Sequence, residues 1–251
     1  MERKFNLQAG ISEIFSSVQG EGKYVGCRQL FIRFIGCNIN CPYCDTDEFA
    51  HNKVPCELEM VAGYAGDFRL PNPLSLDDVL PYIKYRLQRP HHSISLTGGE
   101  PLLHVNAIHE LSEKLGAFKV PMFLETNGIL ADNLAKVIDD IDIISMDIKL
   151  PSDIGSSYWQ EHLAFLQVAA KKDVYVKIVI SKESTVEDFK QAVDIIQSVD
   201  KNILLVLQPI TPMGGLHKPA PEKMLDWQEL AMEKLRDVRV IPQTHKMINL
   251  R

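Results

Sequence analysis

The chain has 251 residues, 45% of them hydrophobic, which is enough to bury the core of one large α/β barrel or two small domains. Its 27 Lys and Arg against 33 Asp and Glu give a net charge of −6 without a basic block, which argues against broad binding to nucleic acid. Because no apolar run approaches the roughly 20 residues of a membrane span and residues 1–10 hold no signal core, we expect a cytoplasmic protein.

Short β-rich runs alternate with helical patterns after residue 30. The expected strands are nearly continuous apolar runs, as is typical of parallel strands buried on both faces. They lie at 30–35, 93–97, 122–125, 141–146, 174–180, 203–208 and 238–241, with helices at 76–87, 134–138, 158–170, 189–199 and 221–236. Ser75 and Thr185 suit the start of two helices, and Pro221 suits the first turn of a third.

Repeated β-α units predict a parallel sheet with helical crossovers in a single domain over residues 1–251. About six units are too few for a closed eight-stranded barrel, so we expect an open, partial (β/α)6 TIM-like barrel, with a doubly wound sheet as the alternative. Either fold places the site at the carboxyl ends of the strands. Residues 49–73 break the rhythm and are expected to form an irregular insertion.

Cys37, Cys41 and Cys44 form a C-x3-C-x2-C run directly after the first of these strands. Three thiolates on one short loop can hold three irons of a 4Fe-4S cluster and leave the fourth iron open to a ligand. A zinc site closed by Cys27, Cys56 or His51 is the alternative, although structural zinc ligands usually come as two separated pairs. A reducing, cytosolic location fits the cluster, and we expect Cys27 and Cys56 to be free thiols.

The segment Thr97-Gly98-Gly99-Glu100-Pro101 ends the next expected strand, where its glycines allow close approach of the backbone to a ligand. Together with the cysteine run, it resembles the radical S-adenosylmethionine (SAM) superfamily, in which a 4Fe-4S cluster and SAM work as one unit. The resemblance implies a radical SAM type of fold and a set of SAM contacts. These are Tyr43, Gly98, Gly99, Glu100, Glu125, Asn127, Ser145, Asp147, Lys149 and Gln208.

Three further runs, Val18-Gln19-Gly20-Glu21-Gly22, Gln243-Thr244-His245 and Cys44-Asp45-Thr46, resemble the 7-carboxy-7-deazaguanine synthases. That family consists of lyases that contract the ring of 6-carboxy-5,6,7,8-tetrahydropterin, with loss of ammonia, in queuosine biosynthesis for tRNA modification. The resemblance implies a Mg²⁺ ion at Thr46, a flavodoxin- or ferredoxin-type reductant and a homodimer. It also implies substrate contacts at Val18, Gln19, Gly20, Glu21, Arg33, Thr97, Gln243 and His245.

Arg33 shares one face of its strand with Phe31 and Ile35, so an unpaired charge there would be costly. It suits a substrate carboxylate, and the alternative is a salt bridge to an acidic residue of the chain. Two rival functions remain. A glycyl-radical-enzyme activase shares the cysteine and Gly-Gly-Glu-Pro motifs but acts on a protein, and a zinc-bearing interaction module leaves the strand-end motifs unexplained.

Overall fold

The computed structural model describes residues 8–44, 54–61 and 68–250, and it centres on one ten-stranded sheet with the order β12-β11-β10-β9-β8-β7-β3-β2-β4-β5. Neighbouring strands run parallel from β3 to β12. Within the described ranges, β12 and β5 do not pair with each other, so the sheet stays open. The strands are β2 (Ile11–Val18), β3 (Arg28–Phe34), β4 (Cys56–Leu58), β5 (Phe68–Leu70), β7 (Ser93–Gly98), β8 (Met122–Thr126), β9 (Ile143–Asp147), β10 (Asp173–Ile180), β11 (Leu205–Pro209) and β12 (Val238–Val240).

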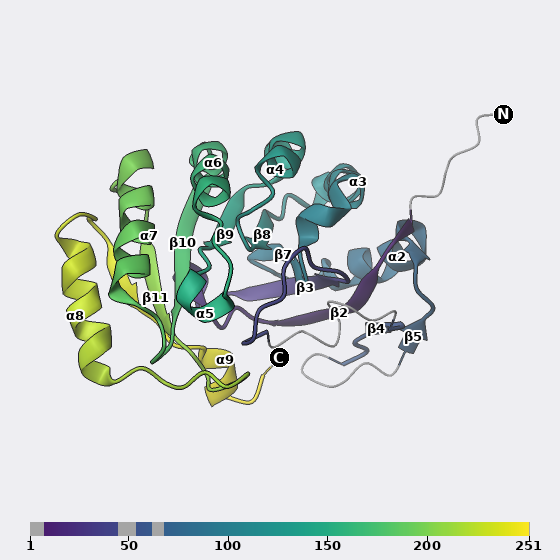
Figure 1. Cartoon of the computed structure of the whole chain (residues 1–251). Helices are drawn as coiled ribbons and strands as arrows, with labels where there is room; N and C mark the ends of the chain where they lie inside the picture. Colours follow the sequence, from purple (N-terminus) through teal and green to yellow (C-terminus); the bar gives the residue numbers. More distant parts are fainter. Residues whose placement is uncertain (1–7, 45–53, 62–67, 251) are drawn as a thin grey trace.

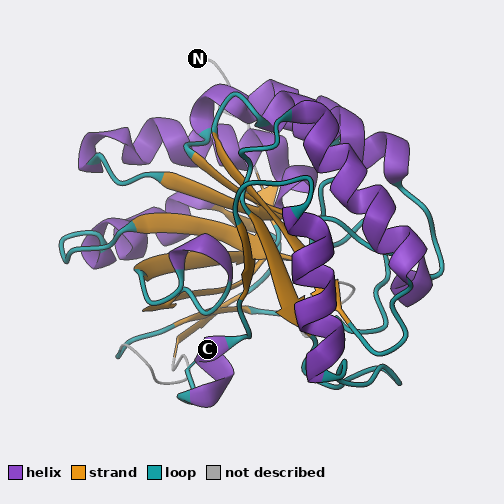
Figure 2. Ribbon diagram, turned by 90° about the vertical axis from the view of Figure 1, so that its left-hand side faces the viewer, coloured by secondary structure: helices purple, strands orange, loops and turns teal. Residues whose placement is uncertain are grey.

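The long helices stand along one face of the curved sheet, and its other face carries loops and short helical turns (Figures 1 and 2). Ser75 and Thr185 cap α2 and α7 as expected, each accepting a hydrogen bond from a backbone N–H of the first turn. The long helices are α2 (Leu76–Arg86), α3 (Val105–Leu115), α4 (Ala131–Val137), α6 (Trp159–Ala169), α7 (Val186–Val199) and α8 (Pro221–Met232). Shorter elements are β1 (Gln8–Ala9), β6 (Leu74–Ser75), η1 (Gly22–Tyr24), η2 (Pro101–His104), η3 (Gly116–Phe118), η4 (Ile138–Asp140), α5 (Pro151–Ile154) and α9 (Thr244–Met247).

The other face of the sheet changes from apolar to polar along its strands. Phe123, Ile143 and Tyr175, near the strand starts, form a small buried cluster that Tyr24 of η1 covers. Because side chains alternate along a strand, Glu125 and Lys177 lie two residues further on, toward the strand ends, on this same face. The sheet therefore carries its polar groups at the carboxyl ends, as the fold class requires.

Two strand regions differ from the expectation. β2 pairs antiparallel with β3. The sequence analysis did not predict this strand, because Ser12, Glu13 and Ser16 interrupt its apolar pattern. These side chains can be buried because they have partners; Ser12 Oγ, for example, donates to Arg33 O at 3.1 Å. The insertion expected to be irregular contributes β4 and β5 to the sheet, so that prediction was wrong for residues 56–58 and 68–70.

Helix α3 was also missed, although Ala107, Ile108, Leu111 and Leu115 bury one face of it at helical spacing. The helix expected at 221–236 ends earlier, at Met232. None of the helices in the described ranges is both long and apolar enough to cross a membrane.

Candidate active site

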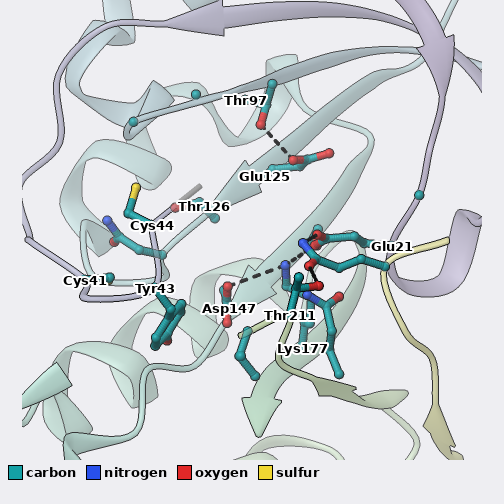
Figure 3. Close-up of a pocket in the computed structure, with 18 of the residues that line it drawn as sticks. Glu21, Cys41, Tyr43, Cys44, Thr97, Glu125, Thr126, Asp147, Lys177 and Thr211 are labelled. Atoms are coloured by element: carbon teal, nitrogen blue, oxygen red, sulfur yellow. Dashed lines mark hydrogen bonds and ion pairs between the residues drawn. The ribbon is translucent and has the colours of Figure 1, made fainter. Parts of the chain in front are cut away.

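A cavity of about 290 Å³ opens at the carboxyl ends of the parallel strands (Figure 3). Its wall includes nearly every residue that the sequence suggested for a site, although these residues come from segments more than 200 positions apart. They are Val18, Gln19, Gly20, Glu21, Arg33, Cys37, Cys41, Tyr43, Cys44, Thr97, Gly98, Gly99, Glu125, Asn127, Ser145, Asp147, Lys149, Gln208, Gln243 and His245. Glu100 lies behind the wall, and Thr46 lies outside the described residues.

The three cysteines lie on the loop after β3 and face the cavity. Burial raises the pKa of the Cys37 and Cys41 thiols, so cluster assembly must displace protons. In the part of the chain that the structure describes, no three His, Cys, Asp or Glu side chains are already arranged around a metal position. Asn127 joins this loop to β8, because its Nδ2 donates to Asn38 Oδ1 at 2.7 Å and lies 3.9 Å from Cys37 Sγ.

The glycine pair at the end of β7 lets the backbone there lie in close contact with Gly36, directly before the cysteine loop. Gly98 has a φ of +121°, and a Cβ on Gly99 would lie 1.9 Å from the carbonyl oxygen of Gly36. Gly99 N donates to Phe34 O at 3.1 Å, and Glu100 N donates to Gly36 O at 2.7 Å. The pair therefore sets the position of the cysteine loop, whatever contact it also makes with a ligand.

Glu100 joins two loops from beneath the cavity wall. Its carboxylate accepts hydrogen bonds from Leu102 N at 3.1 Å, Asn127 N at 2.9 Å and Thr126 Oγ1 at 2.9 Å. Burial raises the pKa of Glu100 to about 7. In the structure Glu100 therefore braces these loops, and its predicted contact with SAM stays a prediction.

One side of the cavity holds polar atoms that have no partner within the described chain. Asp147 Oδ1 and Gln208 Oε1 are both buried without a hydrogen bond. Such atoms are costly unless a ligand donates to them. Lys149 Nζ binds Asp147 Oδ2 at 2.8 Å and lies 5.1 Å above the ring of Tyr43. Hydroxyl, amine and carboxylate groups of SAM would suit these acceptors and this cation, so the residues fit that cofactor.

His162 of α6 ties together the two loops that carry Asn127 and Lys149, a role that the sequence analysis missed. Its Nε2 accepts from Lys149 N at 3.2 Å, and its Nδ1 is 3.0 Å from Gly128 O. Since the carbonyl can only accept, Nδ1 carries the proton. Burial lowers the pKa of His162 to about 4, which keeps the ring neutral. Its position four residues into a helix gave no signal of this contact.

On the opposite side, Glu125 of β8 connects three residues. Gln19 Nε2 donates to Glu125 Oε1 at 2.7 Å, and Thr97 Oγ1 donates to Glu125 Oε2 at 2.7 Å. Ser95 Oγ donates to the same carboxylate at 3.1 Å. The resemblance placed Glu125 with the cofactor, whereas the structure brings it together with residues expected to bind the substrate.

Arg33 finds a partner within the chain. Its Nε lies 2.6 Å from Glu13 Oε1, and its guanidinium lies 5.7 Å from the ring of Phe15. That ring stacks on Phe31 at 5.0 Å, which fixes the apolar wall beside the charge. The alternative of an internal salt bridge is therefore present, and contact between Arg33 and a substrate carboxylate stays a prediction.

The C-terminal motif docks on the N-terminal one. Thr244 N donates to Gly20 O at 2.8 Å, and Gln243 Nε2 donates to Glu21 Oε1 at 2.6 Å. A Cβ on Gly20 would lie 2.0 Å from Nδ1 of His245, so this close contact requires glycine. The two termini thus build one wall of the cavity together.

Lys177 was not among the expected site residues, although a single Lys inside the apolar run of β10 was a visible signal. Its Nζ forms an ion pair with Glu21 Oε2 and lies 3.5 Å from Asp147 Oδ2. Burial alone would raise the pKa of Glu21, but the charge of Lys177 lowers it to about 2. Cys27 and Cys56 are free thiols that do not line the described cavity.

The profile of the Radical SAM superfamily matches residues 31–227 of the chain. A 7-carboxy-7-deazaguanine synthase of Geobacter sulfurreducens is 42% identical over 244 residues, which cover 96% of this chain and 97% of that protein. The 7-carboxy-7-deazaguanine synthase of Methanocaldococcus jannaschii is 34% identical, with coverage of 96% and 99%.

Solved structures share the architecture. QueE from Escherichia coli superposes with a TM-score of 0.59 at 22% identity and covers 97% of this chain and 100% of that one. A domain of a pyruvate-formate lyase-activating enzyme from Bacteroides vulgatus superposes with a TM-score of 0.51 at 15% identity, covering 59% and 98%. At such identities the likeness shows the fold alone, and it confirms the expected α/β architecture.

Proposed function

Because the chain belongs to the 7-carboxy-7-deazaguanine synthase family of radical SAM enzymes, we propose that it converts 6-carboxy-5,6,7,8-tetrahydropterin to 7-carboxy-7-deazaguanine with loss of ammonia. One observation carries the proposal beyond family membership. A single cavity is lined by the cysteine loop, by the unpartnered acceptors Asp147 and Gln208, and by the docked terminal motifs around Glu21.

The cysteine loop is the proposed holder of a 4Fe-4S cluster, through Cys37, Cys41 and Cys44. Held by these cysteines and given one electron by a reductant, the cluster together with SAM would supply radical chemistry at a C–H bond of the substrate. The chain's own contribution is to hold the reacting atoms in line and to exclude water. Asp147, Lys149 and Gln208 orient the cofactor from one side.

The substrate is oriented from the other side of the cavity. Glu21 is half-buried, and Lys177 holds its pKa at about 2, so it is ionised and suits the N–H groups of the pterin's 2-amino-pyrimidinone edge. Glu125 holds Gln19 and Thr97 in place and takes the hydroxyl proton of Thr97 and one amide N–H of Gln19, while Gln29 takes the other. The two side chains therefore present their oxygen atoms as acceptors in fixed directions. Arg33, beside Glu13, is the proposed partner of the substrate carboxylate. These contacts set which ring hydrogen faces the cofactor.

Further parts of the proposal extend beyond the cavity. Thr46 would contribute a hydroxyl to Mg²⁺, and because one neutral hydroxyl holds the ion weakly, Mg²⁺ would bind together with the substrate carboxylate. A flavodoxin- or ferredoxin-type protein would supply the electron, and the enzyme would work in the cytoplasm as a homodimer. Tight binding of Mg²⁺ without substrate would contradict the proposed joint binding of the ion and the substrate carboxylate.

Anaerobic turnover tests the function directly. Reconstituted protein is supplied with 6-carboxytetrahydropterin, SAM, Mg²⁺ and a chemical reductant, and the products are followed by mass spectrometry. We expect 7-carboxy-7-deazaguanine with little net loss of SAM. Formation of 5′-deoxyadenosine without this product would discard the substrate and favour an activase, whereas a colourless protein with one zinc would favour the interaction module.

A pair of cysteine variants provides the matched control. Cys41→Ala removes a thiol that faces the cavity, and we expect it to abolish both the iron content and turnover. Cys27→Ala removes a half-buried thiol outside the cavity, and it should retain both.

A further inference from the structure

A chain of alternating charges crosses the cavity from one side to the other. Glu21 on the turn after β2, Lys177 on β10, Asp147 at the end of β9 and Lys149 just beyond it contact one another in that order. Figure 3 shows Lys177 between Glu21 and Asp147, with interactions drawn to both. One ammonium therefore joins a carboxylate on the substrate side to a carboxylate on the cofactor side.

The ion pairs of Lys177 are largely shielded from solvent. The side chain of Lys177 is only 14% exposed, and Tyr175, two residues before it on the same strand face, is fully buried. Because an isolated charge here would be costly, the ammonium has to remain with its two acceptors. Asp147 Oδ2 is shared by Lys149 and Lys177, while Asp147 Oδ1 has no partner within the described chain.

We propose that Lys177 is a positioning residue that couples the substrate side of the cavity to the cofactor side through Glu21 and Asp147. A ligand whose N–H groups engage Glu21 weakens the pull of this carboxylate on Lys177. The ammonium then pairs more closely with Asp147 and holds Oδ1 of that residue toward the cofactor. The identity of the two sides rests on the proposed function, but the coupling itself rests on the contacts alone.

The test measures SAM affinity of cluster-loaded protein at equilibrium, with and without 6-carboxytetrahydropterin. For the native chain we expect the pterin to tighten SAM binding at least fivefold, and SAM to tighten pterin binding by the same factor. For Lys177→Met we expect this factor to fall to about one and the ratio of 5′-deoxyadenosine to product to rise. Lys177→Arg keeps the charge and should restore part of the coupling.

An exposed ion pair between β10 and η1, the element directly after Glu21, provides the control. Lys23 of η1 binds Asp173 of β10 at 2.6 Å, in an exposed position outside the cavity. Lys23→Met should leave the coupling, the product ratio and the iron content unchanged. If Lys177→Met also kept the native coupling factor, or if Lys23→Met lost it equally, the proposal would be overturned.

A double-mutant cycle measured without substrate separates this inference from the proposed function. Glu21→Gln should tighten SAM binding at least threefold while Lys177 is present, because loss of this carboxylate frees Lys177 to pair more closely with Asp147, as the pterin does. The same change in a Lys177→Met background should have no further effect on SAM affinity. This double variant buries no unpaired charge at these two positions, so it serves if the single variant does not fold. Additive effects would refute the coupling, whereas a native chain that makes no deazaguanine would refute only the function.

Discussion

At the scale of single residues, the cavity contains a polar atom that lowers the stability of the ligand-free protein. Gln208 Oε1 is buried and has no hydrogen-bond partner within the described chain. An unsatisfied buried acceptor costs about 1–3 kcal/mol. We expect Gln208→Leu to raise the free energy of unfolding of the ligand-free protein by about 1 kcal/mol and to weaken SAM binding at least tenfold. Chemical denaturation measures the free energy of unfolding, and calorimetric titration measures the affinity for SAM. A variant that is less stable yet binds SAM normally would contradict the assignment.

His162 makes stability depend on pH. Burial lowers its pKa from 6.5 to about 4, so between these values the unfolded chain binds more protons than the folded one. The stabilisation is fully present above pH 6.5 and is lost as the pH falls toward 4, by up to about 3 kcal/mol. Denaturant unfolding at several pH values measures this slope.

His162→Gln isolates the contribution of that ring. The Gln amide can donate to Gly128 O and accept from Lys149 N, but it does not titrate in this range. We expect the variant to keep its stability near neutral pH and to lose this part of the pH dependence. Glu100 has the opposite slope, because burial raises its pKa to about 7, but it is present in both proteins and cancels in the comparison. An unchanged slope in His162→Gln would exclude the assignment.

At the scale of elements, the contact between β7 and the cysteine loop depends on the absence of a side chain. A Cβ on Gly99 would meet Gly36 O at 1.9 Å, which is backbone and cannot rotate away. Gly99→Ala should therefore displace the cysteine loop, reduce iron incorporation severalfold and lower the melting temperature. Gly116→Ala is the matched control, because a Cβ at that position would have nothing within 4 Å and the φ of Gly116 is −54°. Equal iron content in the two variants would count against this role.

Strand pairing shows what local pattern can and cannot reveal. β10 and β11 are apolar on both faces, so their residues predict buried parallel strands without any knowledge of neighbours. β2 is equally buried but holds Glu13 and Ser16, whose side chains pair with Arg33 and His91, 20 and 75 residues away. A buried polar residue is satisfied by its partner, and the identity of that partner is tertiary information.

At the scale of the whole molecule, the two ends of the chain share one wall of the cavity. Removing residues 243–251 takes away the contacts of Gln243 with Glu21 and of Thr244 with Gly20 but leaves β12 in the sheet. We expect this truncation to weaken pterin binding at least tenfold while SAM binding and cooperative unfolding persist. A protein truncated after Ile248 should bind the pterin normally. Loss of binding in both truncated proteins would show a general effect of shortening the chain. Calorimetric titration distinguishes these outcomes.

Local sequence patterns, with the family resemblance that they carry, indicate the chemistry and the general architecture. Cysteine spacing, the Gly-Gly-Glu-Pro segment and the terminal motifs are local patterns, and apolar runs followed by capped helices are sufficient to predict an open parallel sheet. The partners of the buried polar groups become known from the folded chain alone. The tertiary structure joined Lys177 to Glu21 and Asp147, held Glu100 behind the wall and placed His162 between two loops. The physical reason is that ion pairs and buried hydrogen bonds depend on distances between segments remote in sequence, and only packing sets those distances.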